Sequence, residues 1–304
     1  MANDGQANFL WINGRDGTFR EEALLRGAAF SGDGRPQASM GIALGDVNQN
    51  GAPDLFLTHL GGESNTFYQS AGTQGFLDDS VRSGLSTPGF LMTGFGVCWA
   101  ELDLDGDLDT NVANGSIRRR DKRVDRLVRP EAPPPLSPFA ADYGERNQLF
   151  VNLCRGQFQE VDILPVSDRA VSEVSRGLAC GDLNNDGRPD LVITNAGGST
   201  RVLLNQTESP GQWLGIQVIE PALGGRDAYG AVVTVRSGDQ AWIRWANPAG
   251  SYLSSHDPRL WFGLGDHDTV DGIDVLWPDG THEKFSGTKS GQVIVLSHGA
   301  GLAP

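Results

Sequence analysis

Asp182-Leu183-Asn184-Asn185-Asp186-Gly187-Arg188-Pro189-Asp190, followed by the apolar run Leu191-Val192-Ile193-Thr194, is the stretch that decides the predicted fold. Oxygen-bearing side chains stand at positions 1, 3, 5 and 9 of this loop, and a glycine stands at position 6. Alternate residues of such a loop point inward, the glycine permits a sharp turn, and the carbonyl of position 7 can supply a further oxygen. Because Ca²⁺ takes about six to eight oxygen ligands, the spacing indicates a calcium loop.

The same spacing occurs twice upstream. The three predicted ligand sets, with position 7 acting through its carbonyl, are Asp46, Asn48, Asn50, Ala52 and Asp54; Glu101, Asp103, Asp105, Asp107 and Asp109; and Asp182, Asn184, Asp186, Arg188 and Asp190. One copy alone could equally be an ordinary Asp/Asn/Gly turn, but three copies that each enter a β-type run favour calcium. Position 12 holds Leu57, Val112 or Ile193 instead of the EF-hand glutamate, so each loop is expected to join two strands.

The three loops differ in charge. The middle loop offers four ligand carboxylates, the third offers three, and the first offers two carboxylates with two amides. Affinity in oxygen cages follows charge count and rigidity, so we expect the loop that starts at Asp46 to bind calcium most weakly. Glu101 is one methylene longer than aspartate, which makes it the least regular ligand of its set.

Composition narrows the class of protein. The 304 residues suffice for one large β domain or two domains, and 41 glycines cluster with Asp and Asn between short β-rich runs, which favours an all-β fold. The net charge of −14 disfavours nucleic acid and anionic membranes as partners. No apolar span approaches the length of a transmembrane helix, and the first residues do not form a secretory signal. Cys98, Cys154 and Cys180 are expected to be buried free thiols, with Cys98 and Cys180 on opposite faces of corresponding strands.

Each loop belongs to a longer repeat. A glycine-led strand precedes it, and a strand, a linker, and a further strand–turn–strand unit follow it. Glu101 follows Asp46 by 55 residues, a period that is typical of four-stranded propeller blades. These repeats resemble FG-GAP/VCBS repeats, which also form the calcium-loop blades of integrin α-subunits. The resemblance covers residues 1–208 and implies about three and a half blades of a β-propeller.

The second interval is longer, because Asp182 follows Glu101 by 81 residues. The excess lies in residues 116–142, a basic insert. It contains Arg118, Arg119, Arg120, Lys122, Arg123, Arg126 and Arg129, followed by Pro133-Pro134-Pro135. We interpret the insert as a solvated surface loop, with contact to an anion or a partner as the alternative.

The pattern changes after Pro210. Motifs such as Arg226-Asp227-Ala228-Tyr229-Gly230, Phe262-Gly263-Leu264-Gly265 and Trp277-Pro278-Asp279-Gly280 resemble the ASPIC/UnbV domain, in the right order. The resemblance implies a small β-sandwich-like module over residues 209–304, packed on the last blade. Blades followed by this module resemble the cartilage acidic protein family and bacterial UnbV proteins encoded beside enediyne biosynthesis genes.

Members of that family are expected to close a ring of about seven blades, which three cation loops do not supply. Three explanations follow: the sequence is the C-terminal part of a longer product with further N-terminal blades, two chains complete each other as a homodimer, or an atypical ring joins the first hairpin to the last half-blade.

The sequence shows no nucleophile elbow, phosphate loop or dinucleotide fingerprint. The leading hypothesis is therefore a non-catalytic, calcium-binding β-propeller protein for adhesion or ligand binding, placed outside the cell or in the periplasm by its resemblance. One alternative is an enzyme or accessory factor in natural-product assembly, with a pocket at Arg226, Asp227 and His256. The other is a carbohydrate-binding propeller. The expected partners are a protein, a glycan or a small molecule.

Overall fold

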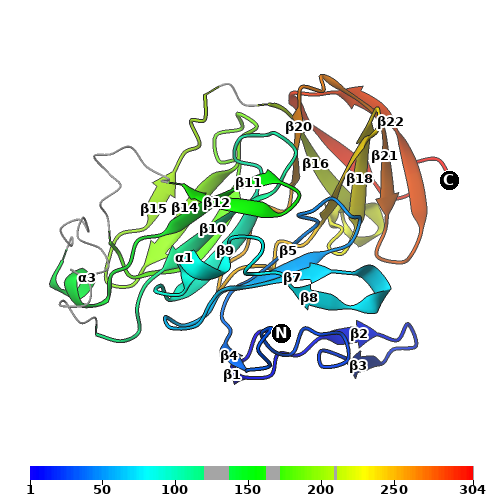
Figure 1. The fold of residues 1–304 in the computed structure, drawn as a ribbon. Coiled ribbons are helices and arrows are strands. Elements are labelled where there is room, and N and C mark those ends of the chain that lie inside the picture. The colour runs from blue at the N-terminus through cyan, green and yellow to red at the C-terminus, as the bar shows by residue number, and fades with distance from the viewer. Residues whose placement is uncertain (120–136, 162–171, 209–210, 304) are drawn as a thin grey trace.

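The computed structural model describes residues 1–119, 137–161, 172–208 and 211–303, and it is all-β, as the sequence predicts (Figure 1). The described helical turns are short: η1 (Gly72–Gln74), α1 (Ser86–Gly89), α3 (Pro138–Tyr143) and η2 (Pro221–Leu223). None of the described helices is long and apolar enough to cross a membrane.

Three antiparallel sheets form the blades. The first sheet contains β5 (Ile42–Gly45), β6 (Asp54–Leu57), β7 (Thr66–Ser70) and β8 (Phe76–Asp78) in chain order. The second contains β9 (Gly94–Ala100), β10 (Asp109–Asn114), β11 (Gln148–Cys154) and β12 (Gln157–Val161). The third contains β13 (Ser175–Gly181), β14 (Asp190–Asn195) and β15 (Arg201–Leu203). Each predicted cation loop joins the first two strands of its sheet.

Apolar side chains fill the spaces between neighbouring blades. Alternate residues of β9 point to opposite faces, so Val97 packs with the first blade while Cys98 packs with the third. Cys180 of β13 also packs on that second cluster, because one face of a blade meets the opposite face of the next. Cys98 and Cys180 do lie on opposite faces of their own blades, as expected. Because these two faces meet, both thiols lie in the same cluster between the second and third blades. The cysteines are free, but Cys154 is exposed, contrary to the predicted burial.

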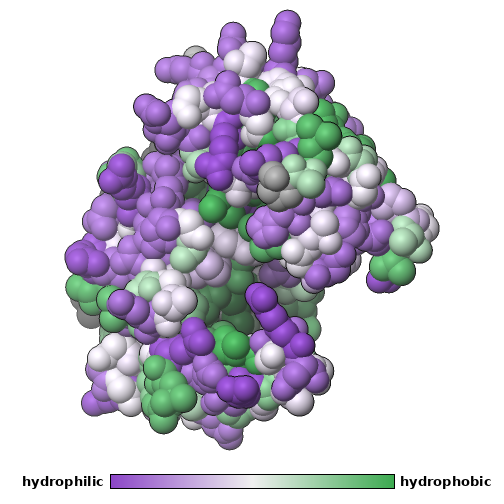
Figure 2. Space-filling view, turned by 90° about the vertical axis from the view of Figure 1, so that its right-hand side faces the viewer, coloured by the Kyte–Doolittle hydropathy of each residue, from purple (hydrophilic) through white to green (hydrophobic). Residues whose placement is uncertain are grey.

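Within the described residues, the strands of the N-terminal segment pair only with one another, and the segment is joined to the first blade by single hydrogen bonds such as that from the Phe76 N–H to the Arg26 carbonyl, at 2.7 Å. Strand β1 (Asp4–Gln6) pairs with β4 (Gln37–Ala38), and β2 (Trp11–Asn13) pairs with β3 (Phe19–Glu21). Among the described strands, β2–β3 has no pairing with β15, so the alternative of a ring closed through these two elements is wrong. Apolar side chains of the segment, including Trp11, Phe19 and Leu25, are exposed. Figure 2 shows apolar surface along a recess on this side of the molecule.

The C-terminal module is a sandwich of two sheets. One contains β17 (Arg226–Asp227), β16 (Gln212–Glu220), β20 (Leu260–Gly265) and, parallel to β16, β23 (Gln292–Ser297). The other contains β19 (Gln240–Trp245), β18 (Val232–Ser237), β21 (Thr269–Leu276) and β22 (His282–Lys289). Buried residues such as Leu214, Val233, Phe262 and Trp277 fill the space between them.

One segment of the module pins all three blades together. Ser251 exchanges backbone hydrogen bonds with Ile42 of β5, at 2.7 and 3.3 Å. Its hydroxyl accepts from the Val97 N–H of β9 at 3.0 Å and donates to the Leu178 carbonyl of β13 at 2.7 Å. The first strands of the blades therefore find polar partners in the module, which stands beside one end of the sheets (Figure 1).

Candidate calcium loops beneath the C-terminal module

The three predicted cation loops share one backbone conformation. Position 4 has a left-handed φ at Gln49, Leu104 and Asn185, with values of 56°, 62° and 60°. Position 6 is also left-handed, with φ of 85° at Gly51, 104° at Gly106 and 87° at Gly187. Left-handed backbone is unfavourable for ordinary L-residues. Its repetition at the same positions shows that the sequence pattern specifies one loop shape.

Position 1 closes the first and third loops in the same way. The buried Asp46 carboxylate accepts the N–H groups of Asn50 and Gly51, each at 2.9 Å. The buried Asp182 carboxylate accepts the N–H groups of Asp186 at 3.2 Å and Gly187 at 2.8 Å. In both loops the two oxygens of position 1 hold the backbone of positions 5 and 6.

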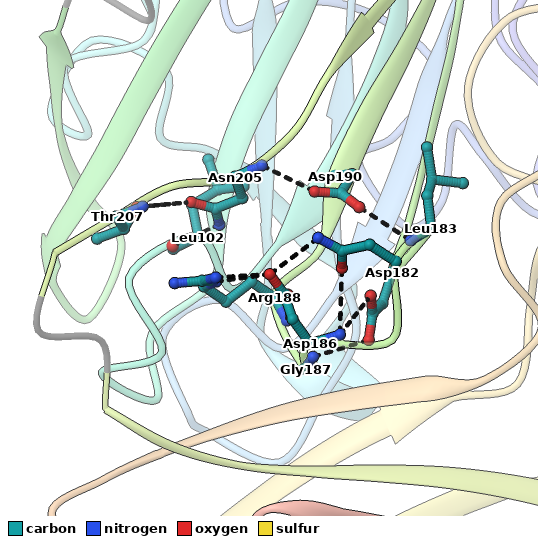
Figure 3. A network of polar contacts seen from close by, with 10 residues as sticks. Leu102, Asp182, Leu183, Asp186, Gly187, Arg188, Asp190, Asn205 and Thr207 are labelled. Atoms are coloured by element: carbon teal, nitrogen blue, oxygen red, sulfur yellow. Dashed lines mark hydrogen bonds and ion pairs between the residues drawn. The ribbon is translucent and has the colours of Figure 1, made fainter.

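Position 9 is a clamp that sequence reasoning described only as a metal ligand. In the third loop, the Asp190 carboxylate accepts from Leu183 N at 2.9 Å and from Asn205 N at 2.8 Å, and so ties the loop to the end of the third strand (Figure 3). The same pair of contacts occurs for Asp54 with Val47 and Ser70, and for Asp109 with Leu102 and Asn152. The sequence feature that could have indicated this clamp is a polar residue at or just after the end of the third strand of each blade, namely Ser70, Asn152 or Asn205.

The middle loop departs from this scheme at position 1. Glu101 is fully buried and accepts from the Gly106 N–H at 3.2 Å through Oε2. Its Oε1 forms an ion pair with Arg244 of the C-terminal module. The N–H of Asp105 turns instead to Asp103 Oδ1, at 3.4 Å. The extra methylene of glutamate carries the carboxylate beyond the loop and towards the module.

The pKa values of buried carboxyl groups are raised in the first two loops. Burial raises the pKa of Asp54 to about 6, of Glu101 to about 7 and of Asp109 to about 9. The charge of Arg244 partly offsets the effect of burial on the pKa of Glu101, whereas neighbouring carboxylates raise the pKa of Asp109 further. In the third loop, the side-chain hydrogen bond from Arg188 instead lowers the pKa of Asp186. A cation would favour the ionised form of the buried groups.

The donor chemistry of the loops fits a hard cation, since every predicted ligand is a carboxylate, an amide or a backbone carbonyl. The geometry is a looser fit. In the part of the chain that the structure describes, which includes the three loops in full, no three His, Cys, Asp or Glu side chains are grouped so that they could hold a metal ion. The position 1 and position 9 carboxylates point to backbone N–H groups. Calcium binding therefore stays a prediction.

The C-terminal module covers the loops unequally. A Cβ placed at Gly187 of the third loop would lie 1.9 Å from the Trp213 ring, and one at Gly106 of the middle loop would lie 2.6 Å from Trp242 Nε1. One at Gly51 of the first loop would meet only the edge of Ile243, at 4.0 Å. The first loop also contacts the second, because the Gln49 amide donates to Asp107 Oδ1 at 2.8 Å.

The predicted pocket at Arg226, Asp227 and His256 does not exist as one site. His256 lines a cavity of about 120 Å³ between blades and module, together with Trp99, Cys180, Arg244 and Trp261. Its Nδ1 lies 3.6 Å from Cys180 Sγ. Arg226 and Asp227 line a separate hollow with Tyr229 and His298. The residues are divided because β17 lies in the sheet that contains β16, while His256 belongs to the segment that crosses the blades.

The basic insert is only partly described. Arg118 and Arg119 lie within the described residues, and Arg119 forms an ion pair of 3.1 Å with Asp142. The remaining predicted cations, Arg120, Lys122, Arg123, Arg126 and Arg129, lie outside the described residues.

The blade sheets with their repeated loops, joined to a β-sandwich, define a β-propeller-type protein with an appended β module. Comparison with known families supports this class: residues 223–303 match the model described as ASPIC and UnbV, and residues 176–209 match the FG-GAP repeat. Both resemblances expected from the sequence are thereby confirmed.

The chain is similar to cartilage acidic protein 1 of Mus musculus, with 27% identity over 285 residues, which are 91% of this chain and 39% of that protein. The Homo sapiens protein is 27% identical over 286 residues, covering 91% of this chain and 38% of its own length. The chain thus spans about two fifths of these relatives. The solved structure of an Agrocybe aegerita lectin that recognises non-reducing terminal N-acetylglucosamine aligns with 96% of this chain and 76% of its own, at 12% identity and a TM-score of 0.41. That score is too low to bear on function.

Proposed function

We propose that this protein is a calcium-stabilised, non-catalytic β-propeller-type protein that works outside the cytoplasm, in adhesion or ligand binding. The observation that carries the proposal is the threefold recurrence of one loop shape with buried carboxylates at positions 1 and 9. The similarity to cartilage acidic protein 1 supports a location outside the cell or in the periplasm.

Calcium would act as a strut within each blade. Positions 3 and 5 and the carbonyls of Ala52, Asp107 and Arg188 would offer oxygens in addition to those of the clamping carboxylates. The ion would offset the charge of groups such as Asp109, whose burial disfavours ionisation. By mass action, each filled site would add about 2.7 kcal/mol to the free energy of unfolding at a hundredfold excess over Kd.

Calcium removal tests this proposal. We expect EDTA to lower the melting temperature by several degrees, and calcium, added back in excess, to restore it. Calorimetry should give a stoichiometry that falls by one site in Asp186→Ala, because Asp186 stands at position 5 and is only partly buried. Asp16→Ala, a change at an exposed turn, is the matched control. An unchanged melting curve in EDTA together with no heat of calcium binding would refute the proposal.

A carbohydrate ligand is the second candidate, because Trp11 is 51% exposed in β2, two residues before Asn13. Exposed indoles beside amides are suited to stacking on sugar rings and hydrogen bonding to their hydroxyls. We expect a glycan array to show binding that Trp11→Ala abolishes. Leu25→Ala is the control, because it changes an exposed apolar residue of the same segment.

A further inference from the structure

The middle loop is the one whose first position is shared with another domain. Glu101 is 1% exposed, and its partner Arg244, at the inner end of β19, is 8% exposed. Within the part of the chain that the structure describes, the position 1 carboxylates of the other two loops, Asp46 and Asp182, form no ion pair, and their oxygens accept loop N–H groups. The three loops thus share a backbone shape but differ in the partner of the position 1 carboxylate.

The C-terminal module is shaped around this glutamate. A Cβ at Gly263 of β20 would lie 2.4 Å from Glu101 Oε2, so a bare glycine is needed where the carboxylate enters the module. The Gly265 N–H donates to the Leu104 carbonyl at 2.9 Å, and the Gly211 N–H donates to the Asp103 carbonyl at 3.1 Å. The module therefore also binds the backbone of the middle loop, at two carbonyls that follow Glu101.

Arg244 is held in place by its surroundings. Its guanidinium lies 5.5 Å from the centre of the Phe262 ring, and its Nη1 donates to the Ile243 carbonyl at 3.0 Å. Its charge also acts on Asp46 of the first loop and on Asp107 of the middle loop. A buried cation in such a place is strongly unfavourable without its carboxylate partner.

We propose that Glu101 is the receptor for an interdomain latch, Arg244, and not a cation ligand, so that calcium in the middle loop and docking of the C-terminal module oppose each other. This inference rests on the proposed calcium function. The cation would be held by Asp103, Asp105, the Asp107 carbonyl and Asp109. Arg244 already supplies one positive charge beside these groups, and it withholds the position 1 carboxylate from the ion.

Two consequences follow from linkage. If Arg244 weakens calcium binding, then calcium must weaken the seating of Arg244 by the same factor. The module would then be held most firmly when calcium is scarce, and its grip on the middle loop would relax as the loop fills.

The arginine at the third loop provides the matched contrast. Arg259 donates to the main-chain carbonyl of Asp182 at 2.8 Å, while its charge is satisfied by Asp257, in an ion pair of 2.6 Å. It therefore touches the loop without taking a ligand carboxylate, and Arg259→Met should leave calcium affinity unchanged.

The test measures calcium binding to the middle loop by calorimetry in a background of Asn50→Ala and Asp186→Ala, which alters position 5 of the other two loops. We expect Glu101→Gln to leave Kd within about twofold, since its carboxylate is not spent on the ion, and Arg244→Met to tighten Kd about fivefold or more. In the double variant Glu101→Gln/Arg244→Met, the gain from Arg244→Met should shrink, because the freed carboxylate is no longer there. Arg259→Met is the control, measured in an Asn50→Ala/Asp105→Ala background that leaves the third loop unaltered.

A second readout needs no calcium. In EDTA, limited proteolysis that separates the C-terminal module from the blades should be faster in Arg244→Met than in the parent protein. The double variant serves if a single variant does not fold, because it leaves no unpaired buried charge. A large loss of affinity in Glu101→Gln, or an unchanged Kd in Arg244→Met, would overturn the inference while calcium binding itself stands. No calcium binding in the parent protein, with faster cleavage in Arg244→Met, would overturn the proposed function and the coupling but retain the latch.

Discussion

The middle and third loops have the same backbone shape, and a tryptophan of the module covers each of them, yet they bind the module's arginines through different groups. Trp242 covers Gly106 and Trp213 covers Gly187, and an arginine of the module reaches each loop. At the third loop the arginine binds a main-chain carbonyl, while at the middle loop it pairs with the carboxylate of position 1. The third loop has aspartate at position 1, and its carboxylate binds only N–H groups of its own loop among the described residues. The middle loop has glutamate there, and the additional methylene lets the carboxylate reach Arg244 of the neighbouring domain.

The first loop provides a reference for this comparison, because its glycine is exposed and the module barely reaches it. Properties that all three loops share belong to the nine-residue pattern. Properties found only at the middle and third loops belong to the module. Three predictions sharpen this division, beginning with the largest expected effect.

Alanine at position 6 should separate backbone strain from contact with the module. All three glycines have left-handed φ, so each substitution should cost about 1–2 kcal/mol from the backbone alone. Gly187→Ala should lose about 1–3 kcal/mol more, because its methyl would collide with the Trp213 ring. Gly106→Ala should follow, and Gly51→Ala should show only the backbone cost. Urea unfolding in EDTA measures the order without interference from calcium, and equal losses at all three positions would show that the module does not press on the loops.

The pH dependence of stability should come in large part from Asp109 of the middle loop in the metal-free protein. Burial raises the pKa of Asp109 to about 9, above an ordinary value of about 3.9. At this group the native state then binds more protons than the unfolded state, so this stabilisation is complete below about pH 4 and is lost as the pH rises through 9.

Asp186 of the third loop should act with the opposite sign. Its pKa is lowered by Arg188, so its contribution is present above the ordinary range and is lost as the pH falls through the lowered value. Unfolding free energies measured in EDTA between pH 5 and 9 should fall with rising pH, and Asp109→Asn should flatten that slope where Asp186→Asn does not. An unchanged slope in Asp109→Asn would place its origin elsewhere.

Arg188 should have the smallest effect. Its ion pair with Asp186 lies at the surface, with side chains 27% and 25% exposed. Exposed pairs are worth about 0.2–1 kcal/mol, so Arg188→Gln should tighten calcium binding at the third loop by no more than about fivefold. Calorimetry in an Asn50→Ala/Asp105→Ala background measures it. A gain larger than that of Arg244→Met at the middle loop would reverse the ranking of buried and exposed competitors.

Much of the fold could be predicted because its signals are local. The loop pattern, the glycine at position 6 and the strand that follows depend on residues close in sequence, and the structure shows them at all three repeats. The clamp at position 9 was only half visible, because its second partner, such as Asn205, lies on the third strand. The pocket at Arg226, Asp227 and His256, which belonged to the enzyme alternative, was wrong because sequence order does not show that the segment containing His256 leaves the sandwich and crosses the blades.

By itself, the sequence determined the repeat, the loop shape and the class of the C-terminal module, because periodicity and turn chemistry act over a few residues. Tertiary structure alone decided that Ser251 binds three blades, that tryptophans cover two of the three loops, and that Glu101 faces Arg244. These contacts join residues as far apart as positions 42 and 251. They depend on how the two domains dock. A buried charge such as that of Arg244 needs a carboxylate partner, and only docking of the domains brings Glu101 close enough to provide it.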